Sequence, residues 1–353
     1  MKLQLNYNQV NSLIRSNFFK FINKNQISIL VITLLMTVLS LFIAASIGSF
    51  NISIFDYVLS TSTSLENKVL EQIRMPRVLL AGLVGASLGI SGASLQGLFR
   101  NPLADPGLIG VSAGAALGAA IVIVLGSSFI PDYIFGPFIL PLSAIMGAAL
   151  VIYLLYLFTK GFGYQGVTYM LLVGIAVNAL ASVGIGILTF ISTDSELRGL
   201  TFWTMGSFGA ANWTLVFPAI IIVIATISLL IPFSRQLDLL QLGEPEAYRL
   251  GVDVKALKFR VIISSAIIVG ISVSLSGMIG FVGLVVPHLM RLLGGVNHNY
   301  LLPASAFFGA SIMIIADLLS RILIQPAELP VGLLTSAIGA PFFLWLIFRI
   351  RKT

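Results

Sequence analysis

The chain has 353 residues, of which 58% are hydrophobic and only 9% are charged, and its mean hydropathy is +1.03. Since a soluble domain has roughly a quarter of its residues charged, this composition excludes a water-soluble globular protein. The absence of cysteine excludes disulfides and cysteine-ligated metal sites. The net charge of +7 does not by itself indicate nucleic-acid binding, because in a membrane protein the positions of Lys and Arg along the chain matter more than their sum.

Apolar stretches recur along the whole sequence. A helix needs roughly 20 residues to cross the hydrocarbon core, so the chain has room for about ten crossings and no separate soluble domain. The expected crossings are 27–47, 78–98, 108–125, 139–158, 168–191, 213–233, 257–276, 279–293, 301–324 and 330–350. The sequence predicts an all-α integral membrane protein of about ten transmembrane helices, with residues 1–26 as a cytoplasmic leader and 27–353 as the transmembrane domain.

Two of the stretches allow a second interpretation. Ala44, Ala45 and Ser46 after the first stretch resemble a signal-peptide cleavage site, but the apolar core is too long and a polar leader precedes it, so we expect no cleavage. The eighth stretch is short and contains Pro287 and His288, so it is either a full crossing or a broken helix.

The distribution of positive charge predicts the orientation. With ten crossings both termini lie on one side, and placing them in the cytoplasm leaves 5 of the 20 Lys and Arg residues outside and 15 inside. The outside residues are Lys68, Arg74, Arg77, Arg198 and Arg321. This excess follows the positive-inside rule and predicts cytoplasmic termini.

Glycine is concentrated inside the second and third stretches. Its positions there are Gly82, Gly85, Gly89, Gly92, Gly97, Gly110, Gly114 and Gly118. Small residues at such spacing let helices approach closely in lipid, so tight packing is the simpler interpretation. The alternative is that some of these glycines border a moving pathway.

The chain has little chemistry with which to power transport by itself. Its apolar stretches contain few ionisable groups of the kind that couple secondary carriers to ions, and the main exception, Asp317, has Arg321 at i+4 for a local ion pair. No G-x-x-x-x-G-K-[ST] phosphate loop is present. We therefore expect that the chain is not an enzyme and that a partner supplies any energy.

The connection at about 234–257 contains signals for a short helix. Pro245 lies between Glu244 and Glu246 at its expected start, Arg249 lies near its end, and Gly251 supplies the stop. On the cytoplasmic side, such a helix is either a docking element for a soluble partner or simply a capped surface turn.

Three arginines lie at expected external helix ends. Arg74 and Arg77 flank Met75 and Pro76, and Arg321 ends the ninth stretch. They either receive carboxylates of an incoming protein or extend to lipid headgroups. Exposed ion pairs of this kind contribute only about 0.2–1 kcal/mol each and mainly orient a partner.

Six motifs in order resemble the FecCD-type permease subunits of type II ABC importers, which take up iron-siderophores, haem and cobalamin. They are Arg74-Met75-Pro76-Arg77, residues 92–97 (GASLQG), residues 100–107 (RNPLADPG), residues 242–252 (LGE with Ala247 and LGV), residues 280–288 (GFVGLVVPH) and residues 328–332 (ELPVG). The resemblance covers nearly the whole chain after the first stretch.

The resemblance implies a type II ABC importer permease fold with specific partners. These are a second permease subunit, identical or not, two cytoplasmic ABC ATPase subunits and an external substrate-binding protein. It assigns binding-protein docking to Arg74, Arg77 and Arg321. It assigns ATPase coupling to the segment containing Leu242, Gly243, Glu244, Ala247, Arg249 and Gly251.

The resemblance also places a cytoplasmic gate at the connection between the fourth and fifth crossings. The residues there are Gly166, Val167 and Thr168. Polar residues expected near the path are Gln96, Asn101 and Asn178, for which hydrogen bonding between helices is an equally good explanation. His288 belongs to a motif shared by importers of unlike substrates, so we assign it a structural role and predict no metal site and no cofactor.

We therefore predict a multi-pass permease of the bacterial cell membrane that passes a ferric-siderophore-type complex inward and binds no nucleic acid. A haem or cobalamin importer is the alternative within the family. A secondary carrier that works alone and a non-transporting scaffold are the alternatives outside it.

Overall fold

The computed structural model describes residues 22–48, 56–57, 59, 63–129, 136, 138–159 and 166–350. Within these residues, seven helical segments are long and apolar enough to cross a membrane. They are α2 (Lys24–Ser46), the continuous segment Ser64–Phe99, α7 (Ile139–Thr159), α8 (Gly166–Ile191), the continuous segment Trp213–Leu240, α13 (Val254–Ser276) and α15 (His298–Ile322). Three shorter apolar helices are α6 (Val111–Phe129), α14 (Val282–Gly294) and α16 (Val331–Ile350).

Every one of the ten expected crossings therefore corresponds to a helix. The continuous segments consist of α4 (Ser64–Val69), η2 (Leu70–Arg74) and α5 (Met75–Phe99), and of α10 (Trp213–Leu230), η5 (Ile231–Phe233) and α11 (Ser234–Leu240). The remaining elements are η3 (Pro106–Ile109), α9 (Asp194–Met205) and α12 (Glu244–Arg249).

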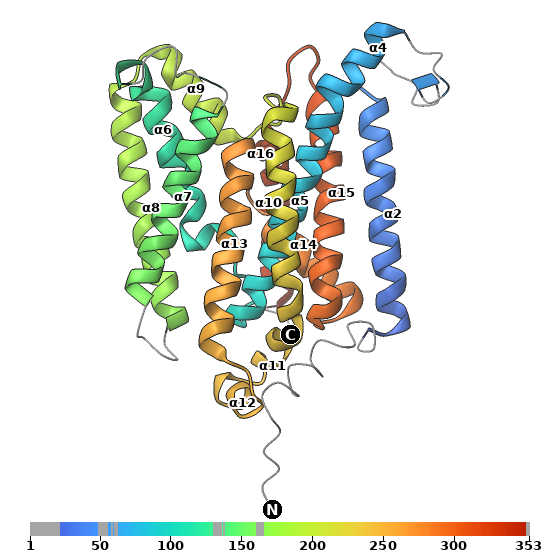
Figure 1. Cartoon of the computed structure of the whole chain (residues 1–353), viewed down its shortest axis with the longest axis vertical. Coiled ribbons are helices and arrows are strands. Elements are labelled where there is room, and N and C mark those ends of the chain that lie inside the picture. The colour runs from blue at the N-terminus through green and yellow to red at the C-terminus, as the bar shows by residue number, and fades with distance from the viewer. Residues whose placement is uncertain are drawn as a thin grey trace, which may run out of the picture.

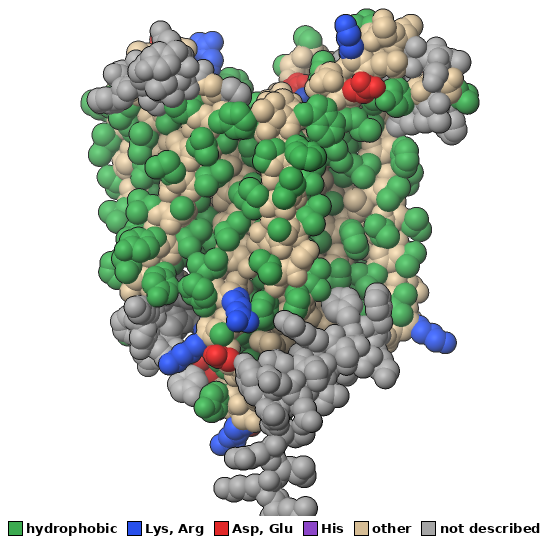
Figure 2. Space-filling view, viewed as in Figure 1, with side chains coloured by type: hydrophobic (Ala, Val, Ile, Leu, Met, Phe, Trp, Pro, Cys, Tyr) green, Lys and Arg blue, Asp and Glu red, His purple; other side chains and the backbone are tan. Residues whose placement is uncertain are grey.

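The bundle has two distinct ends, which we name the α4 end and the α12 end (Figure 1). On the face seen in Figure 2, hydrophobic side chains cover the belt between them and charged side chains lie near the two ends. This is the surface that a hydrocarbon core with aqueous borders requires. The start of α2 and the end of α16 lie toward the α12 end (Figure 1), as an even number of crossings demands.

Helix α5 forms the centre of the molecule. Of the most apolar window in the segment Ser64–Phe99, 83% is buried, compared with 17% in α2 and 17% in α8. A Cβ atom at Gly85 would overlap the carbonyl oxygen of Gly309 on α15, and one at Gly89 would overlap that of Ser305. The close-packing interpretation of these glycines is therefore confirmed.

The second crossing begins earlier than the sequence indicated. Thr63 and Glu66 form a capping box, and the helix runs from Ser64 through the π-helical turn η2 into α5. Pro76 follows this turn, where a wider helical turn tolerates the missing proline N–H. Arg74 and Arg77 consequently lie within a helix, not in the loop before it.

The eighth crossing is short. Helix α14 has 13 residues and contains Pro287, which at 1.5 Å per residue gives about 20 Å, less than the hydrocarbon thickness. Phe281, which precedes it, has a positive φ of 67°. The segment is therefore not a full crossing, but it is not broken at Pro287 either: it is one short continuous helix preceded by the non-helical residues 277–281.

Two other boundaries differ from the expectation. Helix α9 was not expected, although Thr193 and Glu196 form a capping box at its start. The connection predicted at 234–257 is mostly helical, because α11 continues directly from α10 and α13 starts at Val254.

Candidate functional site

A cluster of four charged side chains, which we call the charge cluster, lies at the α4 end. Arg77 Nε is 2.9 Å from Asp317 Oδ1, and Arg321 Nε is 3.2 Å from Asp317 Oδ2. The two terminal nitrogens of Arg77 also donate to the two oxygens of Glu328 at 3.0 and 2.9 Å. The local pair expected between Asp317 and Arg321 is confirmed, and Arg77 joins it to the loop before α16.

The charge cluster is largely withdrawn from solvent. Asp317 is fully buried and both arginines are 8% exposed, whereas the Glu328 side chain is 47% exposed. Two positive and two negative groups balance each other, and such matching is what makes charges tolerable at this depth. Glu328 is the most exposed member of the charge cluster.

Arg74 lies beside the charge cluster but has different partners. Its Nη1 donates to the carbonyl oxygens of Ala45 and Ser46 at 2.9 and 2.8 Å. These carbonyls belong to the last turn of α2, where helices have unpaired acceptors and favour positive charge. The structure thus brings the three predicted docking arginines to one end, with their guanidinium groups directed into the protein.

Helix α12 forms a short ordered element at the opposite end. Gly243 and Gly251, at φ of 106° and 89°, turn the chain into and out of it. Glu244 is buried and pairs with Lys258 of α13 at 2.8 Å, and Ala247 is fully buried. These contacts fix α12 against the bundle, so the predicted short helix is confirmed as an element.

The outer surface of α12 and its flanks carries large apolar side chains. Leu242, Tyr248 and Leu250 are 63%, 68% and 51% exposed. Arg249 pairs with Glu246 at 2.7 Å, and both side chains are mostly exposed. Large exposed apolar side chains beside charged residues are typical of a protein contact surface.

The side chains of the predicted path residues Gln96, Asn101 and Asn178 each bond to backbone groups and not to one another. Gln96 is buried and its Nε2 donates to Leu284 O of α14 at 3.3 Å, and Asn178 Nδ2 donates to Gly107 O at 3.3 Å. Asn101 lies after α5 and its Oδ1 accepts from the backbone N–H of Leu103 at 2.9 Å. These are contacts between or after helices, in agreement with the structural alternative.

The predicted gate is helical where the structure describes it. Gly166, Val167 and Thr168 form the first turn of α8 and not a loop, and their side chains lie outside what the structure describes, as does the connection 160–165. Helix α8 thus begins two residues before the expected crossing 168–191, and the gate at these residues stays a prediction.

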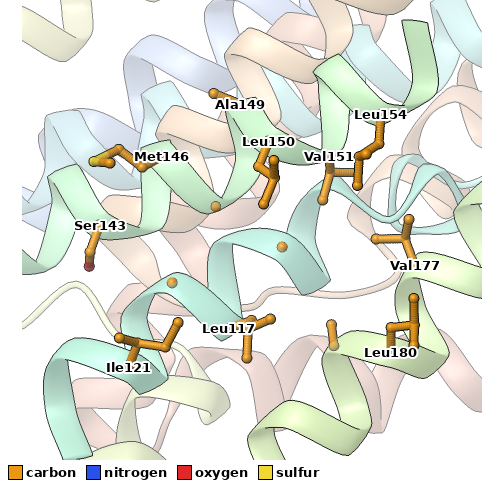
Figure 3. A pocket seen from close by; sticks show the side chains of 14 residues that line it. Leu117, Ile121, Ser143, Met146, Ala149, Leu150, Val151, Leu154, Val177 and Leu180 are labelled. Carbon is orange, nitrogen blue, oxygen red and sulfur yellow. The ribbon is translucent and has the colours of Figure 1, made fainter. Parts of the chain in front are cut away.

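A cavity of about 690 Å³ lies between α6, α7 and α8 (Figure 3). Met146, Leu150 and Leu180 line it together with small residues such as Gly118, and Ser143 is the single side chain with a polar atom in its lining. None of the predicted path residues lines it. An apolar cavity of this kind offers no groups to orient a charged chelate.

The two histidines differ in their surroundings. His288 packs edge-on against Phe342 with 6.2 Å between ring centroids. His298, expected in a loop, is the first residue of α15, is 2% exposed and lies with its Nδ1 2.6 Å from Asp238 Oδ1 of α11. No group of three or more metal-ligating side chains occurs in the described part of the chain.

The fold is that of a polytopic membrane bundle with an ordered short helix at one end. The sequence profile of the FecCD transport family matches residues 32–349. The chain belongs to this family.

Individual relatives agree with this assignment. The hemin transport system permease protein of Yersinia pestis is 47% identical over 280 residues, covering 79% of this chain and 83% of that protein. The vitamin B12 import system permease protein of Vibrio vulnificus is 40% identical over 290 residues, covering 82% and 86%.

The fold agrees as well. A solved structure of a metal-chelate type ABC transporter in an inward-facing conformation superposes with a TM-score of 0.81 at 36% identity, covering 91% of this chain and 99% of that one. The chain therefore has the type II ABC importer permease fold, is a multi-pass protein of the bacterial inner membrane, and depends on ATPase and substrate-binding partners.

Proposed function

We propose that this chain passes a bulky iron chelate inward, driven by ATP hydrolysis in subunits that contact α12. The proposal rests on α12, which lies at one end of the bundle (Figure 1) and exposes the apolar residues Leu242, Tyr248 and Leu250, while charged side chains gather near that end (Figure 2). The α12 end is then cytoplasmic, which agrees with the 15 of 20 Lys and Arg residues expected on that side.

The sequence alone suggests a ferric-siderophore complex as the substrate. The 47% identity to a hemin permease favours haem as the first compound to test, and the vitamin B12 relatives favour cobalamin as the second. All three are large metal chelates. The apolar cavity between α6, α7 and α8 supplies no basis for choosing among them.

Reconstitution tests this function directly. Proteoliposomes containing the permease with its ATPase and binding protein should accumulate haemin, a ferric hydroxamate or cyanocobalamin only when ATP is supplied. Uptake that follows an ion gradient without the ATPase would instead identify a secondary carrier. An absence of flux for every chelate, with all partners present, would identify a scaffold.

For the opposite face, we propose that the external binding protein docks on the charge cluster and that Glu328 competes with its carboxylates for Arg77. Glu328 is half exposed and accepts hydrogen bonds from both terminal nitrogens of Arg77, whereas Asp317 accepts from Nε. An incoming carboxylate therefore replaces Glu328 and not Asp317.

Replacing Glu328 with Gln should accordingly strengthen docking. The exposed competing pair is worth up to about 1 kcal/mol, so we expect up to about a fivefold gain in affinity for the binding protein, largest at low ionic strength. Binding to the solubilised permease complex measures this, and Glu66→Gln on exposed α4 is the matched control. Equal affinity in the two variants would argue against docking on Arg77.

A further inference from the structure

Helix α11 connects α12 to the core of the bundle through polar contacts. Gln241 Nε2 donates to Gly97 O at the end of α5 at 2.8 Å, and Ser234 Oγ donates to Asn299 Oδ1 of α15 at 2.6 Å. Both Ser234 and Asn299 are buried. A displacement of α12 can therefore reach α5 and α15 through α11, in addition to the route through the Glu244–Lys258 pair to α13.

A further contact joins Asp238 of α11 to His298 of α15. One oxygen, Asp238 Oδ1, accepts the backbone N–H of His298 at 2.9 Å and lies 2.6 Å from its ring Nδ1. The carboxylate thus binds the N-terminus of α15, where a helix has unpaired donors and favours negative charge. Two bonds to a single oxygen fix both the position and the direction of α15.

The ring of His298 is also held from its other side. A Cβ atom at Gly97 of α5 would overlap His298 Nε2, so the ring fits only against a glycine. Nε2 is buried and has no partner among the described residues, so the proton is best placed on Nδ1, where Asp238 accepts it. The imidazole is therefore wedged between α11 and α5.

Beyond this contact, α5 and α15 form a stiff pair that extends to the other end. Helix α15 has 25 residues, about 37 Å, and packs on α5 backbone against backbone at Gly85 and Gly309. At its far end, Asp317 of α15 binds Arg77 of α5 within the charge cluster. Since the pair is tied at both ends, its helices move together.

We propose that Asp238 and His298 are positioning residues that lock α12 to the α5–α15 pair, so that an ATP-driven displacement of α12 is delivered to the charge cluster. This proposal rests on the proposed function, because it needs an ATPase that moves α12. It assigns a role to a hydrogen-bonded pair that contacts neither face where the partners are proposed to bind.

Paired spin labels test this transmission. Because the chain has no native cysteine, Ile73→Cys near the charge cluster and Ile191→Cys at the end of α8 direct labels to two exposed positions of the permease, assembled with a cysteine-free ATPase. The distance between the labels is measured by pulsed electron resonance with and without ATP. We expect ATP to shift it in the labelled parent chain.

The variants separate transmission from folding. In Asp238→Ala and His298→Leu we expect the ATP-driven shift to be lost while ATP hydrolysis continues, and uptake per ATP to fall about fivefold or more. Asp238→Asn and His298→Asn each retain an acceptor or donor near the original atom, so both should preserve the shift. His298→Leu keeps most of the ring's volume without its hydrogen bond, whereas His298→Asn keeps a donor in a smaller side chain, so these two variants separate hydrogen bonding from packing.

Each outcome decides one proposal. A full shift in both Asp238→Ala and His298→Leu would overturn the role of this pair and leave the proposed function intact. No ATP-driven shift in the parent complex would overturn the proposed function itself, and with it the transmission.

Discussion

Replacing Asp317 with Ala should lower the free energy of unfolding by about 3–5 kcal/mol, because it leaves two buried guanidinium groups without their shared partner. Arg77 would retain only half-exposed Glu328, and Arg321 would retain its 3.2 Å bond from Nη2 to Ala44 O. The loss exceeds that of an ordinary ion pair because the uncompensated charges stay at a depth where water does not reach them.

Chemical unfolding of the permease in lipid–detergent bicelles measures this loss, and Glu246→Ala is its control. The pair between Glu246 and Arg249 is as short, at 2.7 Å, but its side chains are 51% and 74% exposed, so its removal should cost at most about 1 kcal/mol. If the two variants lose the same free energy of unfolding, water reaches the charge cluster and burial does not make Asp317 more important than an exposed carboxylate.

Features that repeat along one helix were predictable from the sequence. The crossings follow from apolar length, and the contact between Asp317 and Arg321 follows from the helical i, i+4 spacing. Helix α12 follows from Pro245 beside two acids and from the glycine that ends it. In each case the physical cause lies within a few residues of the feature.

Contacts between distant residues were not predictable in this way. Glu328 reaches Arg77 across 251 residues of sequence, and nothing local marks it as the partner. His298 was placed in a loop because the polar residues around it interrupt the apolar pattern, although Asn297 caps α15 immediately before it. A cap signal next to a histidine is the clue that could have placed it at a helix start.

The α4 end shows a second limit of hydropathy. Residues 64–77 carry five charged side chains, so the apolar pattern starts only at Val78, yet the helix is continuous through them. Capping by Thr63 and Glu66 and pairing of Arg77 stabilise a helix there that hydropathy alone does not report. The three arginines for which docking is predicted lie together at one end of the bundle and are more buried than the sequence indicated.

Replacing Gly85 with Ala should destabilise the protein by about 3 kcal/mol or more, at or above the upper end of the usual cost of overpacking. The added Cβ would overlap the carbonyl oxygen of Gly309 and lie 2.6 Å from Met313 Cβ, and neither is the tip of a flexible side chain that can rotate away. Helices α5 and α15 would have to separate.

The matched control is Gly186→Ala in α8, where nothing lies within 4 Å of the added atom. There the better helix propensity of alanine should leave stability unchanged or raise it by up to about 1 kcal/mol. Thermal unfolding in the same detergent compares the two, and similar midpoints would show that the α5–α15 contact is loose. A loose contact would also count against the proposed transmission from α12 to the charge cluster. Helices that are not in close backbone contact can slide past each other, so a displacement of one end would not reach the other.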